Sequence, residues 1–266
     1  SIAVIPKGMS FPYGTDEIDQ TTTELLFFTV NTENTLYVYD LTGTSFLSLI
    51  DNPFPITNSM LGPGFLESPT ALAISAEEDT VTIFVLNDKE GDSSVRSLSV
   101  NFQTGEIGSP ETLATMTESG RRLVDIAYFD QTDALYVTKK VFTDQDVFAQ
   151  GWVYEILNAT ERSNAENLNP DSNFIAEPQN LTGLTPAFKN REETAADLLV
   201  SREIAGWVNQ YDILDGGDIE AAFTFGAPFD FPQAVAFDCT NDRLVMTHVP
   251  FTKASERKFF QAFPTQ

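Results

Sequence analysis

Short runs of apolar and β-branched residues, separated by polar turns, recur along the whole chain. In five of them an acidic residue leads the run, at positions 24, 79, 133, 197 and 242, so the pattern returns every 45 to 64 residues. Runs of this length and composition are typical of β-strands. Sheet units that recur every ~40–50 residues are typical of a β-propeller. The acid-led runs are residues 24–28, 79–83, 133–137, 197–200 and 242–246.

Further strand candidates flank these runs and predict sheets of four strands. A strand follows each run, a strand precedes three of them, and outer strands are predicted in three copies. We therefore predict one all-β domain over residues 1–266, a β-propeller of four-stranded antiparallel blades. Five blades are expected, or six if another lies in residues 141–190; a β-sandwich is the rival fold, but it would not explain the acid-led copies. The flanking candidates are 37–41, 95–100, 151–157, 206–214 and 258–263, then 71–74, 123–129 and 234–237, then 46–50, 111–114 and 221–225.

The two chain ends suggest how such a ring could close. The fifth copy ends at its third strand, residues 258–263, and the apolar residues Ser1–Ile5 are suited to supply a fourth. Under this hypothesis both ends of the chain seal the last blade, and no sheet edge is left exposed.

The net charge of the chain excludes some classes of binding partner. The chain has 39 acidic and 15 basic residues, a formal net charge of −24. Such a surface repels nucleic acid and anionic membranes, and no apolar stretch approaches the ~20 residues of a membrane-spanning helix. We interpret the charge as a solvated surface suited to a saline extracellular medium. The alternative is that some carboxylates converge on Ca²⁺, which prefers oxygen ligands.

Several features favour secretion. Two N-glycosylation acceptors, Asn158-Ala159-Thr160 and Asn180-Leu181-Thr182, lie in a polar insertion over residues 158–185. The chain starts at Ser1 rather than Met, which indicates a processed, trimmed or partial form. The single Cys239 excludes an internal disulfide and is interpreted as a half-buried structural thiol, with an intermolecular bridge as the alternative. We predict an extracellular glycoprotein in which the insertion and a second long loop, residues 51–68, shape one rim.

Candidate catalytic residues are few. His248, the single histidine, would have to serve any Ser-His-Asp triad, and no G-x-S-x-G motif nominates a serine. A packing or hydrogen-bonding role is the favoured interpretation of His248. Zinc clusters, a P-loop and a dinucleotide fingerprint are all missing from the sequence.

An acid inside an apolar strand is the more informative candidate. Asp125 interrupts the inner-strand run 123–127, and a buried unpaired carboxylate is costly. The favoured interpretation pairs it with Arg121 or Arg122. Alternatively, Asp125 holds a cation or acts as a base. Asp230, just before the last inner strand, is a second candidate metal ligand.

Two segments resemble known blades. Pro69-Thr70-Ala71-Leu72-Ala73-Ile74-Ser75 through Val85, with 95–100 and the turn Thr104-Gly105, looks like one blade of the lactonase and SMP-30/gluconolactonase group of propellers. Residues Pro232–Asp238 through Met246 look like another. The resemblance implies a propeller fold and metal-dependent lactonase or esterase activity, with Glu, Asn and Asp side chains on a central Ca²⁺. It does not assign that ligand set to residues of this chain.

Two functional hypotheses follow. The favoured one is a secreted, acidic binding or scaffolding module without chemistry of its own, whose partner is a protein, a glycan or another copy of the chain. The alternative is a Ca²⁺-dependent lactonase or esterase with its site at the central channel. There the metal would polarise the carbonyl and a carboxylate would activate water. Its candidate catalytic residues are Asp125 and His248, and its candidate metal ligands are Asp125 and Asp230.

Overall fold

The structure is a computed structural model in which nearly all regular structure is β. Among the described residues there are twenty strands, one 3₁₀ turn and one four-residue helix, α2 (Asn58–Leu61). No helix in this part of the chain is long and apolar enough to cross a membrane. The described residues are 2–5, 25–43, 50–77, 79–89, 92–117, 120–130, 132–141, 151–168, 175–177, 181–187, 197–202, 207–213, 219–225, 232–238, 243–248 and 261–264.

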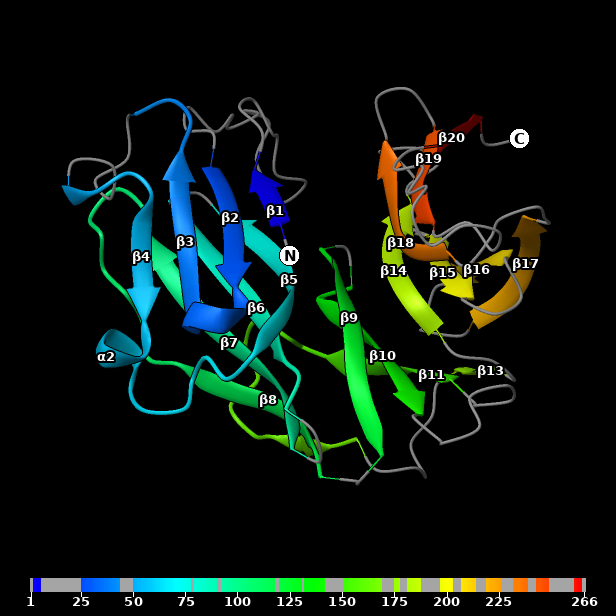
Figure 1. The fold of residues 1–266 in the computed structure, drawn as a ribbon, viewed down its shortest axis with the longest axis horizontal. Coiled ribbons are helices and arrows are strands. Elements are labelled where there is room, and N and C mark those ends of the chain that lie inside the picture. Colours follow the sequence, from blue (N-terminus) through cyan, green and yellow to red (C-terminus); the bar gives the residue numbers. More distant parts are fainter. Residues whose placement is uncertain are drawn as a thin grey trace. The chain divides into compact units, whose positions relative to one another are not determined.

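The chain divides into two compact units, and the first contains two sheets. This unit consists of residues 1–119 together with 157–169. Its first sheet has the order β1-β2-β3-β4 (Figure 1), and its second has the order β12-β8-β7-β6-β5. The strands are β1 (Ile2–Ile5), β2 (Leu25–Val30), β3 (Thr35–Asp40), β4 (Phe54–Thr57), β5 (Pro69–Glu77), β6 (Thr80–Asn87), β7 (Ser93–Asn101), β8 (Glu111–Met116) and β12 (Glu166–Asn167).

The second unit, residues 120–156 and 170–266, contains three sheets. The third sheet has the order β13-β11-β10-β9, the fourth β14-β15-β16-β17 and the fifth β18-β19-β20. Their strands are β9 (Arg121–Phe129), β10 (Ala134–Val141), β11 (Gly151–Leu157), β13 (Ile175–Glu177), β14 (Leu181–Ala187), β15 (Asp197–Arg202), β16 (Trp207–Ile213), β17 (Ile219–Phe225), β18 (Pro232–Asp238), β19 (Arg243–His248) and β20 (Gln261–Pro264).

Each acid-led run forms the second strand, in chain order, of one of the five sheets. They form β2, β6, β10, β15 and β19, which in each sheet follow the first strand of that sheet along the chain. β2, β6, β15 and β19 pair antiparallel with both the preceding and the following strand, and β10 pairs antiparallel with the preceding strand β9. The prediction of an all-β chain of antiparallel sheets is therefore confirmed. The number of blades and the closure of a ring stay predictions.

The N-terminal strand does not join the last sheet. β1 pairs antiparallel with β2, with Ile2 opposite Phe28 and Ile5 opposite Leu25. The expectation that residues 1–5 complete the fifth sheet was wrong. The physical reason is that β2 offers β1 an equally apolar partner strand.

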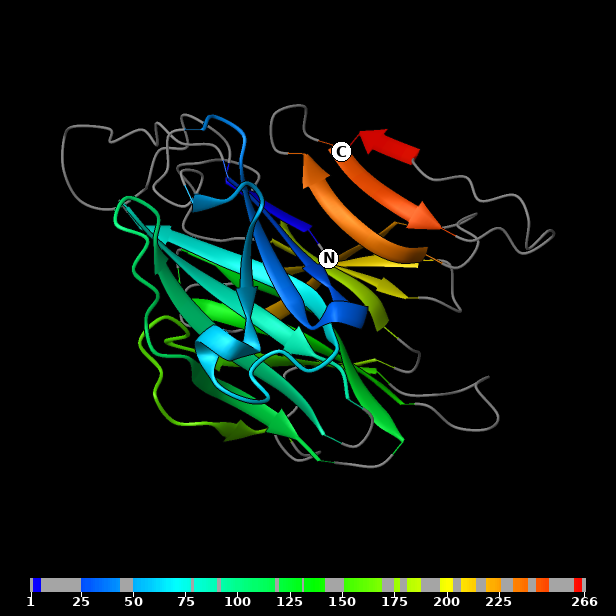
Figure 2. The same ribbon diagram turned by 60° about the vertical axis from the view of Figure 1, so that its left-hand side comes forward.

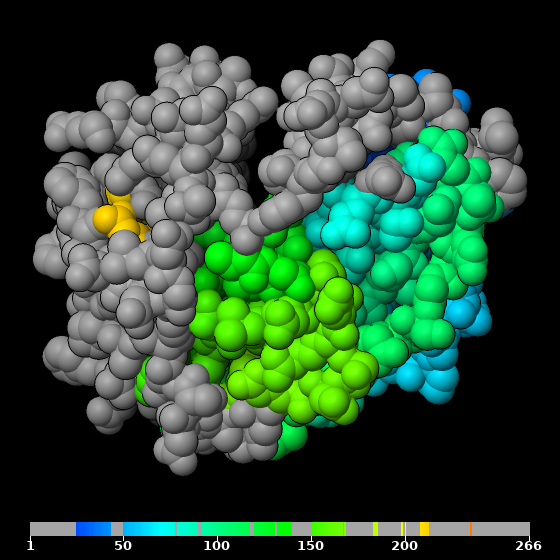
Figure 3. Space-filling model, turned by 180° about the vertical axis from the view of Figure 1, so that it is seen from behind, coloured from blue at the N-terminus to red at the C-terminus, as the bar shows by residue number. Residues whose placement is uncertain are grey.

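The polar insertion does more than lengthen a loop. Residues 157–168, which we call the strap, leave β11 and add β12 to the free edge of β8 as a parallel strand. The amide of Leu168 donates to the carbonyl of Thr115 at 2.9 Å, and the Leu168 side chain is buried. Figure 3 shows strap atoms, in light green, at the molecular surface.

Each unit has its own apolar core. In the first unit the first sheet lies over the second, as Figure 2 shows, and alternate residues of β2 and β3 pack against β5, β6 and β7. In the second unit a core forms between the third and fourth sheets, where the rings of Phe129 and Tyr136 meet edge to face at 4.9 Å. Alternation of buried and exposed positions along the strands is what places these side chains on one face.

Candidate functional site

Asp125 lies on β9, the first strand of the third sheet, opposite Thr138 of β10. The two residues are joined closely: the amide of Asp125 donates to Thr138 Oγ1 at 3.0 Å, and this hydroxyl lies 3.4 Å from the Asp125 carbonyl. The register shifts directly after this pair, between Thr138 and Lys139. Bulges of this kind redirect side chains and are common beside functional sites.

The Asp125 carboxylate connects two neighbouring sheets of the second unit. Its Oδ1 accepts from the amide of Ile126 and its Oδ2 from the amide of Leu184 on β14, both at 3.0 Å. Burial raises the pKa of Asp125 to about 7, although both amide hydrogen bonds favour the charged form. A carboxyl group with this pKa exchanges its proton near neutral pH.

The predicted ion pair between Asp125 and a neighbouring arginine is not what the structure shows. The carboxylate is bound by two backbone amides, and the Arg121 guanidinium lies 5.5 Å from the centre of the Trp152 ring. Strand geometry explains the difference. Residues three or four apart in a strand are separated by about 10–13 Å along its axis, too far for a direct contact.

A buried lysine lies past the same bulge, and the sequence analysis missed it. Lys139 is fully buried, and its Nζ donates to the Tyr154 hydroxyl at 3.1 Å. The Nζ is also 4.8 Å from the centre of the Trp152 ring, within cation–π range. The sequence signal that could have indicated a partner for Lys139 is the spacing of Trp152 and Tyr154. Two residues apart on β11, they place both rings on one face of the strand.

A buried tyrosine and a glutamate form a second polar contact in this sheet. The hydroxyl of Tyr136 donates to Glu155 Oε1 at 2.8 Å. Burial raises the pKa of both groups, and the hydrogen bond to Glu155 raises that of Tyr136 further. This hydrogen bond anchors a ring of the core.

The remaining predicted site residues are not brought to Asp125 by any contact within the described ranges. His248 ends β19 opposite Pro232, and its side chain lies outside the described part of the chain. Asp230, Asn180 and Cys239 also lie outside the described residues. Asn158 is described and exposed.

The described residues do not fit a calcium site at Asp125. Within them no three His, Cys, Asp or Glu side chains lie close enough to share a metal ion. Both oxygens of Asp125 already accept backbone amides. Because Ca²⁺ takes six to eight oxygen ligands, this carboxylate and its described neighbours do not form such a site.

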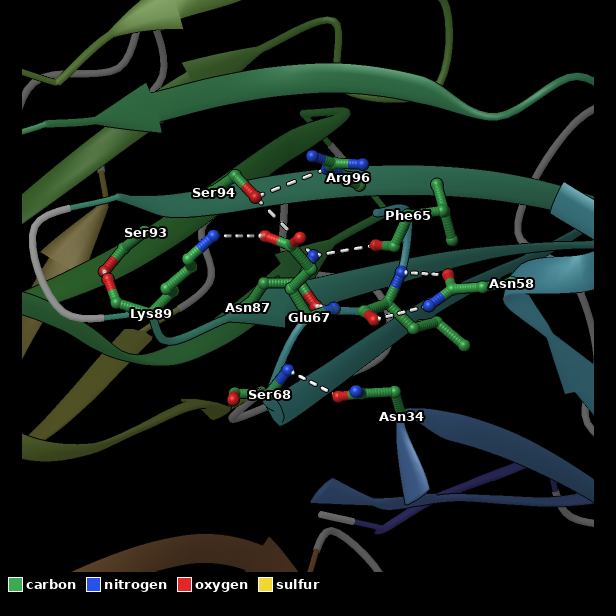
Figure 4. Close-up of polar contacts among 11 residues, drawn as sticks. Asn34, Asn58, Phe65, Glu67, Ser68, Asn87, Lys89, Ser93, Ser94 and Arg96 are labelled. Carbon is green, nitrogen blue, oxygen red and sulfur yellow. Dashed lines mark hydrogen bonds and ion pairs between the residues drawn. The ribbon is translucent and has the colours of Figure 1, made fainter. Parts of the chain in front are cut away.

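A different polar cluster lies in the first unit, where a loop is held by asparagine side chains (Figure 4). We call residues 65–68, which lead into β5, the clamped loop. Asn58 donates to the carbonyl of Leu66 at 2.8 Å and accepts its amide at 2.7 Å. Asn87 donates to the carbonyl of Phe65 at 2.9 Å and accepts the amide of Glu67 at 3.0 Å.

Further contacts complete this cluster. Asn34 Oδ1 accepts the amide of Ser68 at 2.8 Å, and Lys89 forms an ion pair with Glu67 at 3.3 Å. The Arg96 guanidinium lies 5.9 Å from the centre of the buried Phe65 ring. The side chains of Lys89 and Glu67 are 53% and 39% exposed, so the pair presents both charges to solvent. The sequence indicated a long loop here but not the asparagines that fix it.

Comparison with known proteins supports the fold and no more. No family model matches the chain, and no curated protein matches it in sequence. A putative 6-phosphogluconolactonase from Bacteroides fragilis superposes with a TM-score of 0.50 at 10% identity, over 90% of this chain and 66% of that one.

Two other solved structures are less similar. The Dos1 propeller gives a TM-score of 0.47 at 12% identity, over 91% of this chain and 56% of that one. A protein from Lactobacillus plantarum gives 0.41 at 13% identity, over 100% and 67%. This chain thus spans between 56% and 67% of the length of the three structures. The likeness to the putative 6-phosphogluconolactonase supports the resemblance to the propeller-type lactonase fold that the sequence suggested.

Proposed function

We propose that the chain is a secreted, propeller-type binding module that recognises a polar protein surface through the clamped loop. The observation that supports this best is the use of Asn34, Asn58 and Asn87 to fix the backbone of four consecutive residues. A loop already held in one conformation loses little entropy when a partner binds. Phe65 and Leu66 are buried, while Glu67 and Ser68 are partly exposed, so the second half of the loop is accessible to a partner. Rigid support behind the accessible part of a loop is typical of binding sites.

The chemistry of this loop favours a protein partner. Lys89 and Glu67 offer one cation and one anion side by side at the surface, while Phe65 of the same loop is buried. Paired exposed charges orient a partner and select against a wrong one more than they add affinity. Lys89 is also one of only 15 basic residues in a chain of net charge −24, so an exposed cation is a scarce feature for a partner to recognise.

A variant that reverses the Lys89–Glu67 ion pair, and so keeps both charges at the surface, tests the proposal. The double variant Glu67→Lys with Lys89→Glu keeps two opposite charges but exchanges their places. The matched control is Arg162→Glu with Glu166→Arg, which reverses the ion pair of the strap. The wild-type protein is immobilised, and the proteins that it retains from an extract of the source organism are identified and purified. Each is then titrated against the wild type, the clamped-loop variant and the control variant.

We expect at least tenfold weaker binding by the first variant and unchanged binding by the control. A partner that binds all three forms equally, or the retention of no partner, contradicts the proposal. Sedimentation velocity over a range of concentrations and a glycan array identify the other outcomes, self-association and glycan binding.

Asp125 supports a second candidate, hydrolysis of lactones or esters. A carboxyl group with a pKa of about 7 on the first strand of a sheet has the acidity expected of a general base at neutral pH. Asp125 would take the proton of a water molecule that attacks the substrate carbonyl. Hydrolysis of γ- and δ-lactones and of a p-nitrophenyl ester is measured for the wild type and for Asp125→Asn.

We expect the rate to rise as the pH passes through 7 and to fall at least a hundredfold in the variant. Equal rates for both proteins, or no rate above that of buffer, reject this candidate. The calcium ion predicted from the sequence stays a prediction, and the same assay and a thermal melt with and without EDTA test it.

A further inference from the structure

Most asparagine side chains of the described residues bind another group of the protein, whereas the exposed Asn158 belongs to the minority that do not. The amides of Asn52 and Asn101, like those of the three asparagines at the clamped loop, bind backbone groups. Asn158 is exposed, and within the described ranges its only hydrogen bond is accepted by its backbone carbonyl, from Glu161 at 3.2 Å. A substituent on the Asn158 amide would therefore break no contact that the described residues make.

The backbone at Asn158 has the conformation of a turn. Asn158 follows the last residue of β11 and has φ of +51°, in the left-handed region that asparagine tolerates better than most residues. It opens the turn at the start of the strap. The next side chain, Ala159, points inward and is buried, while Thr160 is half-buried. The turn is thus anchored by Ala159 and Leu168 and presents Asn158 to solvent.

An exposed apolar side chain adjoins the same position. Leu157 is 49% exposed, one of few large apolar residues in the described part that are. Isolated exposed leucines are common and need no explanation by themselves. Here the exposed leucine directly precedes an accessible asparagine in the sequence Asn158-Ala159-Thr160, and a covalently held sugar would cover it.

We propose that Asn158 carries an N-linked oligosaccharide. In the reaction, Nδ2 of Asn158 attacks the anomeric carbon of an oligosaccharide held on a polyprenyl diphosphate, the donor class used in secretory membranes. A nitrogen–carbon bond forms, the carbon–oxygen bond to the diphosphate breaks, the amide loses one proton, and the lipid diphosphate leaves. No group is oxidised or reduced. The modification is independent of the clamped loop and of Asp125.

The chain offers a clean assay for this site. Trypsin cleaves after Lys140 and Arg162, so the peptide 141–162 contains Asn158 and no other asparagine. The peptide 163–189 contains the second acceptor, Asn180. The full chain is directed into the secretory pathway of a eukaryotic cell, and occupancy of both peptides is measured by mass spectrometry before and after peptide N-glycosidase. Retained and secreted protein are both analysed.

Four variants separate a glycan from a structural effect. Asn158→Gln and Thr160→Ala should abolish the modification of peptide 141–162, Thr160→Ser should retain it, and Asn180→Gln should leave it unchanged. Thermal melts establish that the variants fold. A glycan found on Asn158 with this pattern supports the proposal. Folded wild-type protein with an unmodified peptide 141–162, or with a glycan on Asn180 alone, overturns it.

Discussion

At the scale of single residues, Asp125 connects protonation to stability. Its carboxyl group has a pKa of about 7 in the folded chain because of burial, against an ordinary value near 4. Between these two values the folded chain binds a proton that the unfolded chain has released. The contribution of this group to stability is therefore fully present below about pH 4 and is lost as the pH rises to about 7.

Asp125→Asn should remove this pH dependence. Urea unfolding of both proteins is measured from pH 4 to pH 8, and the difference between their unfolding free energies is plotted. One unit of pKa shift corresponds to about 1.4 kcal/mol, and the side chain is partly solvated, so we expect the difference to change by roughly 2 kcal/mol across the window. Because the other acids titrate equally in both proteins, the difference isolates Asp125. A difference that is flat with pH would contradict the raised pKa.

Asn87 illustrates how one side chain holds a loop. It is only 1% exposed and satisfies both the carbonyl of Phe65 and the amide of Glu67. Asn87→Ala leaves both groups without this partner, and we expect a loss of about 2 kcal/mol in the free energy of unfolding. Asn101→Ala is the control, because Asn101 accepts two amides in an exposed turn where water can replace it. Equal losses for the two variants would show that the clamped loop is not specially stabilised.

At the scale of elements, the sequence pattern located strands better than it located their partners. The acid-led runs were recognisable because an apolar run and a polar turn are both local features. The pattern predicts the outer strand of the first sheet at 46–50, of which residues 46–49 lie outside the described part of the chain, whereas the edge strand of that sheet, β4, spans Phe54–Thr57. This strand contains Pro55, and prolines argue against a strand unless it lies at an edge, a fact that only the assembled sheet reveals.

The sequence pattern does not predict which segments far apart in the chain pair with each other. β12 is two polar residues long, and its pairing depends on the free edge of β8, some fifty residues earlier. Asp125 was recognised as unusual from the apolar residues around it. Its actual partner, the backbone amide of Leu184, could not be predicted, because every residue except proline carries the same group.

Leu157 and Leu168, the first and last residues of the strap, provide a matched test of its packing. Leu168 is 1% exposed and Leu157 is 49% exposed. Leu168→Ala should lower the free energy of unfolding by roughly 2–3 kcal/mol because it leaves a cavity, whereas Leu157→Ala should change it by less than about 0.5 kcal/mol. Hydrogen exchange of residues 158–168 should accelerate in the first variant only. Equal effects would mean that the strap is not packed on the second sheet.

At the scale of the whole molecule, the path of the chain links the two units. The chain passes from one unit to the other three times, after residues 119, 156 and 169, so neither unit is one continuous segment. β11 carries Trp152 in the second unit and continues directly into the strap of the first. Loss of the strap from its sheet would therefore release the end of a strand in the other unit.

This connectivity predicts that the molecule unfolds as one cooperative system. Both tryptophans of the chain, Trp152 and Trp207, belong to the second unit, so their fluorescence reports on that unit alone, while far-UV circular dichroism reports on both. Leu168→Ala weakens only the first unit directly. If the units unfold together, the variant lowers the midpoints of both signals equally, by roughly 5 °C for a loss of about 2 kcal/mol. If the units are independent, the fluorescence midpoint stays at its wild-type value while circular dichroism acquires an earlier transition, and the connection through the strap then contributes nothing to cooperativity.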